Sequence, residues 1–190
     1  MSYLTGHPTG EFAAVTQSAS LVRPRRTNTG ASGAAGARHL LSDARRAVDF
    51  RLEFWDGAHL EVTLHGSGAE PSWHWCLFSA LKELSALAPN WDSYGAEPLS
   101  AVAVGRVVNA LLPVLPDDAP KPAVVPTRDG GVQLEWHRDG VAFEIRVPPA
   151  GPVSYLLADD GTDEESEWQG APARHAGAIS DAFRRLTPAG

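Results

Sequence analysis

Two glutamates in the C-terminal half of the chain have the spacing that comes closest to a chemical site. A two-residue turn at 139–140 would place Glu135 directly opposite Glu144 in an antiparallel hairpin. His137 and Arg146 would then be diagonal neighbours on the same polar face. Opposed carboxylates beside a histidine can bind a divalent metal or perform acid–base chemistry. The alternative is a solvated outer face, on which Arg146 offsets Glu135 and water screens the remaining charge.

A second hairpin predicted earlier in the chain favours the solvated face. Residues 50–54 and 60–64 alternate apolar with polar side chains on either side of Asp56-Gly57. The two apolar faces match only across an odd number of loop residues, so we expect a three-residue loop or a bulge. The expected cross-strand pairs are Phe54–Leu60, Leu52–Val62 and Glu53–Glu61. Acidic pairs in two different hairpins indicate a general surface pattern and not a dedicated site.

The loop at residues 90–98 is the most distinctive segment of the chain, because it combines two aromatic residues with a carboxylate. Asp92 can form an Asx-turn, and Gly95 can adopt a positive φ. Trp91 and Tyr94 can then pin the loop onto the sheet. Alternatively, the two aromatic rings and the carboxylate form a small recognition pocket on the surface.

Two motifs carry a resemblance to known proteins: Asn-Trp-Asp-Ser-Tyr-Gly-Ala at 90–96 and Pro-Thr-Arg-Asp-Gly-Gly-Val-Gln-Leu-Glu-Trp at 126–136. With a helix before and after the first motif, the chain resembles a widespread group of small uncharacterised bacterial and phage-encoded proteins. The resemblance covers roughly residues 75–157. It implies a shared α+β fold and no particular activity.

Several classes of protein are not indicated by the sequence. The single cysteine, Cys76, excludes an intrachain disulfide and a zinc site built from several thiolates. The chain has no Gly-rich phosphate loop before a helix, no Gly-x-Ser-x-Gly elbow and no His-Glu-x-x-His stretch. No apolar run has the length of a membrane span, and the N-terminus does not resemble a secretory signal. We therefore expect a cytoplasmic protein with no cofactor and no membrane partner.

The charge is distributed unequally along the 190 residues. Residues 1–46 contain six arginines and two acids, a net charge of +4, which leaves −11 for the rest of the formal −7. This first segment is also rich in Gly, Ala, Ser and Thr, so we predict a flexible basic arm over 1–46. An acidic body repels phosphates, so any nucleic acid would have to bind the arm through Arg23, Arg25 and Arg26.

The periodicity of the body predicts an α+β domain over 47–158. Two strands are followed by a helix that Pro71 or Ser72 opens and that runs to about Leu87. A second helix follows, which Ser100 caps and which ends near residue 112. An edge strand at 124–125 and three further strands follow, and a turn at 139–140 gives the cross-strand pairs Trp136–Phe143, Leu134–Ile145 and Val132–Val147. The order ββααββββ predicts one antiparallel sheet with two helices packed on one face.

The C-terminal segment, 159–190, is predicted to be less regular. Six acidic residues lie within 159–169, and such blocks usually repel themselves into a solvated loop. The spacing of apolar residues over 173–186 predicts a short, loosely held helix.

Since no catalytic signature is present, the sequence predicts a non-enzymatic protein-interaction module, such as an accessory, immunity or antitoxin-like subunit of a larger bacterial complex. The expected partner is a protein with a basic surface. The candidate binding residues are Trp91, Asp92, Tyr94, Glu135, His137, Glu144 and Arg146. Two alternatives stay open: a small metal-dependent hydrolase that uses Glu135, Glu144 and His137, and an adaptor that binds nucleic acid through the basic arm.

Overall fold

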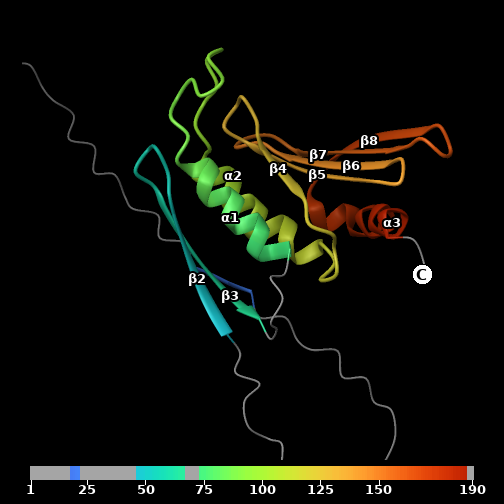
Figure 1. Ribbon diagram of the computed structural model, residues 1–190, viewed down its shortest axis with the longest axis horizontal. Coiled ribbons are helices and arrows are strands. Elements are labelled where there is room, and N and C mark those ends of the chain that lie inside the picture. Colours follow the sequence, from blue (N-terminus) through green and yellow to red (C-terminus); the bar gives the residue numbers. More distant parts are fainter. Residues whose placement is uncertain (1–17, 22–45, 67–72, 188–190) are drawn as a thin grey trace, which may run out of the picture.

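The computed structural model describes residues 18–21, 46–66 and 73–187 of the chain (Figure 1). Three strands form a first sheet in the order β1-β3-β2: β1 (Ser18–Leu21), β2 (Arg46–Glu53) and β3 (His59–Gly66). Five strands form a second, antiparallel sheet in sequence order: β4 (Ala123–Pro126), β5 (Val132–Arg138), β6 (Val141–Val147), β7 (Val153–Asp159) and β8 (Glu164–Gly170). The helices are α1 (Trp73–Ser85), α2 (Ala101–Arg106) and α3 (Ala176–Leu186).

The α+β class and the order of elements agree with the prediction, but the expected single sheet is two sheets. Figure 1 shows α1 and α2 between the β2–β3 hairpin and the five-stranded sheet, with α3 beneath the latter. The chain that follows α2 is buried on more than one side. Val107 and Val108 are both buried, as are Leu111 and Leu112, although consecutive residues of a helix point in different directions. One continuous core therefore joins both sheets through the helices.

The β2–β3 hairpin has the predicted three-residue loop, but its cross-strand pairs lie two residues from the predicted ones. Phe54 N donates to Ala58 O at 3.0 Å, and Gly57 adopts a φ of +78° in the loop. The observed pairs are Leu52–Leu60, Phe50–Val62, Arg51–Glu61 and Glu53–His59. The predicted Glu53–Glu61 opposition is therefore wrong, because the short loop brings Arg51 opposite Glu61.

The β5–β6 hairpin has the predicted register throughout. Asp139 and Gly140 both adopt positive φ, 51° and 81°, as a two-residue hairpin turn requires. The apolar pairs are Trp136–Phe143, Leu134–Ile145 and Val132–Val147. Every one of these side chains is buried, so this pairing sets which face of the sheet meets the helices.

The two central helices begin close to the predicted positions. Ser100 caps α2, because its Oγ accepts a hydrogen bond from Val102 N at 3.2 Å. The predicted helix continues beyond Arg106 as a π-helical turn (η1, Val107–Leu111) and a short 3-10 turn (η2, Leu112–Val114). The Asn109 amide donates to Gly105 O at 2.9 Å at the start of this irregular region.

The acidic segment forms an edge strand, β8, and the predicted solvated loop over 159–169 is wrong. Its carboxylates point into solvent, while Trp168 stacks on Tyr155 with ring centroids 5.4 Å apart and an interplanar angle of 8°. Arg185 of α3 forms ion pairs of 3.3 Å with Asp159 and 3.1 Å with Glu164. Partial burial of Trp168 against the core and ladder pairing with β7 outweigh the weak repulsion between hydrated charges.

Helix α3 packs on the five-stranded sheet through the predicted apolar face. Its buried residues are Ile179, Ala182, Phe183 and Leu186. Phe183 makes edge contacts with Trp136 and Phe143 at centroid distances of 5.0 and 5.6 Å. The helix is therefore part of the core.

The predicted basic arm, with Arg23, Arg25 and Arg26, lies largely outside the described residues. Its described parts are β1, which pairs in parallel with β3, and Arg46, the first residue of β2. Among the described residues, no helix combines the length and apolar character needed to cross a membrane.

Candidate functional site

The outer face of the five-stranded sheet carries most of the predicted site residues. Figure 1 shows the described helices on one side of this sheet and no described element on the other. On the open side, the strand pairings align one row across four strands: Glu135, Glu144, Leu156 and Glu167. The row therefore brings three carboxylates and one leucine together on a single face.

The predicted opposition of Glu135 and Glu144 is confirmed, but its compensation differs from the prediction. The Nε2 atom of Gln133 donates hydrogen bonds of 2.9 Å to Glu135 Oε1 and 2.9 Å to Glu144 Oε2. One amide group therefore bridges both carboxylates. Gln133 is absent from the predicted site, although its position two residues before Glu135 places it on the same face.

Arg146, which was expected to offset Glu135, instead forms an ion pair of 3.0 Å with Asp129. Asp129 lies in the turn between β4 and β5, and it also accepts a hydrogen bond of 2.5 Å from the Thr127 hydroxyl. Partial burial opposes ionisation of Asp129, but the Thr127 hydroxyl and the Arg146 charge outweigh it and lower its pKa. Asp129 thus holds Arg146 at one end of the open face.

The metal-site hypothesis gains no support from the arrangement of these side chains. His137 Nε2 lies 3.7 Å from Glu135 Oε2, and both groups reach solvent. Within the described part of the chain, no three His, Cys, Asp or Glu side chains are grouped as a metal site requires. Glu135, Glu144 and His137 therefore form a polar cluster without the convergence of a ligand set.

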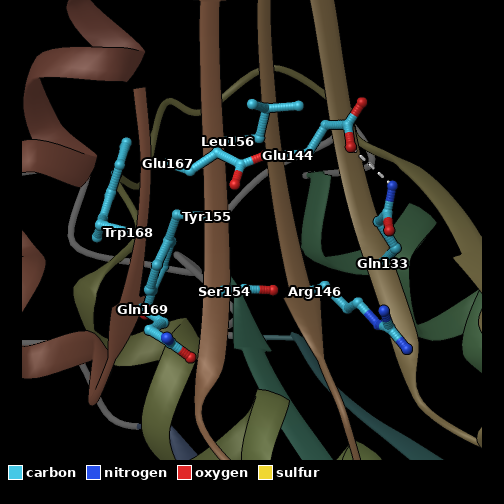
Figure 2. A pocket seen from close by; sticks show the side chains of 9 residues that line it. All are labelled: Gln133, Glu144, Arg146, Ser154, Tyr155, Leu156, Glu167, Trp168 and Gln169. Atoms are coloured by element: carbon cyan, nitrogen blue, oxygen red, sulfur yellow. Dashed lines mark hydrogen bonds between the residues drawn. The ribbon is translucent and has the colours of Figure 1, made fainter. Parts of the chain in front are cut away.

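A shallow hollow of about 430 Å³ lies on this face, beside the carboxylate row. Figure 2 shows Glu167 reaching from β8 across the face toward Leu156 and Glu144, with Gln133 and Arg146 at the other side. Leu156 is half-buried and contributes an apolar side chain to the lining of the hollow. Glu167 was missed from the sequence, because a residue expected in a solvated loop has no predicted strand neighbours.

The loop at 90–98 has the predicted turn geometry. Asp92 Oδ1 accepts hydrogen bonds from Tyr94 N at 2.7 Å and Ala96 N at 3.0 Å, and Gly95 adopts a φ of +87°. Arg128 Nε lies 2.9 Å from Asp92 Oδ2. Desolvation opposes the charged form of Asp92, but the two backbone donors and Arg128 outweigh it and lower its pKa.

The two aromatic residues of the loop differ in their roles. Trp91 is half-buried, and its Nε1 donates to Glu97 O at 3.1 Å, so it holds the loop together. Tyr94 is 81% exposed, so the prediction that it pins the loop onto the sheet is wrong. The Arg128 guanidinium instead lies over its ring, 5.7 Å from the centroid, and donates to Tyr94 O at 2.8 Å.

The two sequence motifs meet at the turn between β4 and β5. Glu97 N donates to Arg128 O and Ser100 N to Gly130 O, each at 2.9 Å. Gly130 has a φ of +75°, and a Cβ there would lie 2.7 Å from Pro98 O. The predicted site residues therefore form two patches joined by residues 127–131: Trp91, Asp92 and Tyr94 on the loop, and Glu135, His137, Glu144 and Arg146 on the sheet.

Comparisons with protein-family models, with curated proteins and with solved structures find no match for this chain.

Proposed function

We propose that the protein is a non-enzymatic protein-binding module and that it binds a basic surface of its partner through the outer face of the five-stranded sheet. The observation that carries this proposal is the row of Glu135, Glu144 and Glu167 around the half-buried Leu156. An apolar centre with a charged surround is the composition expected of a protein-binding surface.

The charge balance of the row supports a cationic partner. Among the described residues, no arginine or lysine forms an ion pair with Glu135, Glu144 or Glu167, because Arg146 is held by Asp129. The Gln133 amide that bridges two of the carboxylates is neutral. A lysine or arginine from a partner would relieve the remaining repulsion and would steer the encounter between the two proteins.

The loop patch supplies a second contact at the end of the same surface. Tyr94 exposes most of its side chain, and the Arg128 guanidinium holds one face of its ring through a cation–π contact. Exposed tyrosines held in one orientation contribute contact area at a small entropic cost. We propose that Tyr94 contacts the partner, while Trp91 and Asp92 maintain the conformation of the loop.

The role we propose is that of an accessory, immunity or antitoxin-like subunit acting in the cytoplasm. The metal-dependent hydrolase and the nucleic-acid adaptor are not favoured by any observation on the described residues. The adaptor depends on Arg23, Arg25 and Arg26, which lie outside them.

A capture experiment from native lysate tests the proposal with a matched control. The test variant combines Glu135→Gln, Glu144→Gln and Glu167→Gln, and the control removes the same charge at exposed positions elsewhere through Asp56→Asn, Asp118→Asn and Asp181→Asn. We expect a stoichiometric partner on the wild-type and control proteins that is lost from the test variant. A partner retained equally by all three proteins would contradict this binding surface.

A further inference from the structure

The outer edge of β2 has the features of a strand that pairs with another chain. β2 is eight residues long and lies at the end of the order β1-β3-β2. It contains no proline, whereas the edge strand β4 ends in Pro126 and the edge strand β8 carries Glu164, Glu165 and Glu167. Proline and charged side chains protect sheet edges from pairing. β2 has no proline, and its central charges, Asp49 and Arg51, are of opposite sign, so they can complement each other across a two-fold axis.

The hydrogen bonding of the hairpin determines which groups of β2 face this edge. Phe54 N donates to Ala58 O, and hydrogen-bonded pairs alternate along an antiparallel ladder. The even-numbered residues of β2 therefore direct their backbone groups toward β3. The odd-numbered residues, including Asp49 and Arg51, direct theirs toward the outer edge, where no described strand pairs with them.

We propose that β2 pairs with β2 of a second copy of this chain, antiparallel and with the two-fold axis at Phe50. A two-fold axis perpendicular to the sheet passes between two copies of the same residue, so the central residue faces itself. With Phe50 at the centre, Asp49 faces Arg51 of the second copy, and Arg51 faces Asp49 of the second copy. Val48 of each copy likewise faces Leu52 of the other copy.

Charge complementarity disfavours the two adjacent registers; it allows an axis at Phe50 and also one at Leu52, which would pair Arg51 with Glu53, and of these two residues only Phe50 lines the groove beside this edge. An axis at Asp49 would place two aspartates opposite each other, and an axis at Arg51 would place two arginines opposite each other. Directly opposed like charges destabilise a strand pair, whereas opposite charges stabilise it. The register centred on Phe50 gives two Asp–Arg pairs, with their backbone groups available for hydrogen bonding.

A groove beside the outer edge of β2 supports the proposed pairing. It has a volume of about 590 Å³ and is lined by residues 48–51 of β2 together with Trp75, Ser79, Lys82 and Glu83 of α1. Trp75 is 42% exposed and contacts Phe50 edge-on, with ring centroids 4.9 Å apart. Because Phe50 lies at the proposed axis, pairing brings the two grooves together and buries Trp75 of both copies. The product is one continuous sheet across the dimer.

The mass of the 190-residue chain in solution tests the proposal. Light scattering after gel filtration should give twice the chain mass of 20.2 kDa. Arg51→Asp and Asp49→Arg each create two like-charge pairs, and each variant alone should dimerise at least about a hundredfold more weakly. An equimolar mixture of the two variants should form a heterodimer, because both Asp–Arg pairs are then restored.

The dimerisation experiment has two controls and three outcomes that would overturn the proposal. Circular dichroism establishes that each variant is folded, and Arg138→Asp, on the distant β5–β6 hairpin, should stay dimeric. A wild-type protein that is monomeric up to its solubility limit would overturn the proposal. A dimer that Arg51→Asp does not weaken, or a mixture of the two variants that does not associate, would also overturn it.

Cross-linking tests the register with smaller changes to the protein. In a Cys76→Ser background, Asp49→Cys protein mixed with Arg51→Cys protein should form a disulfide-linked heterodimer under oxidation. Paired residues of adjacent strands have Cα atoms about 5.5 Å apart, within the range that a disulfide spans. Either protein alone should cross-link much less. Equal cross-linking of one variant with itself would indicate a different register and contradict the proposal.

Discussion

Arg146 donates to Asp129 at 3.0 Å, although it lies on the same sheet face as the opposed glutamates. This pairing withdraws the nearest arginine from the carboxylate row and attaches the sheet to the turn at 127–131. The same turn receives hydrogen bonds from the loop at 90–98. The loop and the sheet face are consequently one surface, with the ion-paired Arg128 and Arg146 at one end and a negative row across the strands.

The first prediction concerns that negative row. Glu135→Gln combined with Glu144→Gln should weaken partner binding and reduce its dependence on salt, because Coulombic attraction between exposed charges is screened by ions. Binding measured calorimetrically at several salt concentrations checks this. If the double variant instead binds its partner normally but loses a metal-dependent turnover, the interaction hypothesis is wrong and the hydrolase is right.

The second prediction concerns the bridging amide. Gln133→Ala should destabilise the protein by about 1 kcal/mol, because the opposed glutamates lose their shared donor. In the Glu135→Gln, Glu144→Gln background the same change should cost less, since the repulsion is already absent. A double-mutant cycle from urea unfolding measures the difference, and identical costs in both backgrounds would contradict the compensating role.

The third prediction concerns the core. Trp136 is buried, donates to Pro120 O at 2.7 Å and contacts the rings of Phe143 and Phe183. Trp136→Ala should lower the free energy of unfolding by about 3–5 kcal/mol. Trp55→Ala, at a site that is 59% exposed, is the control and should change it by less than about 0.5 kcal/mol. Equal effects would mean that the face assignment of β5 is inverted.

The fourth prediction concerns the junction of the two motifs. Gly130→Ala should destabilise by about 1–3 kcal/mol, because a Cβ would meet Pro98 O and the residue has a positive φ. Gly177→Ala, in α3, adds a Cβ with nothing within 4 Å of it and should be neutral or stabilising. Thermal unfolding of both variants provides the comparison. Similar melting temperatures for both would argue against a tight junction.

The fifth prediction concerns acid. The pKa values of Asp92 and Asp129 are lowered below the ordinary 3.8, so their charged forms stabilise the folded state. This stabilisation is complete well above pH 3.8 and is lost as the pH falls through the lower folded-state values. Asp129→Asn and Asp92→Asn should therefore flatten the decline of the melting temperature between about pH 5 and pH 2. An unchanged slope in both variants would contradict these shifts.

Local chemistry along the chain determined a large part of this fold. The Asp139-Gly140 turn sets the β5–β6 register, since both residues tolerate positive φ and the apolar pairs then match. The cap at Ser100 and the Asx-turn at Asp92 follow from side chains that reach backbone groups two residues away. Each of these features depends on residues only a few positions apart along the chain, so the sequence alone was enough to predict it.

Tertiary structure decided the features that depend on distant segments. Arg146 could have formed an ion pair with either Glu135 or Asp129. It pairs with Asp129 because of where the 127–131 turn lies in the folded protein. The acidic segment forms β8 because Trp168 packs against Tyr155. This pairing places Glu167 beside Leu156 on the open face. Charge repulsion is visible in a sequence, but the burial that outweighs it depends on surfaces that exist only after the chain has folded.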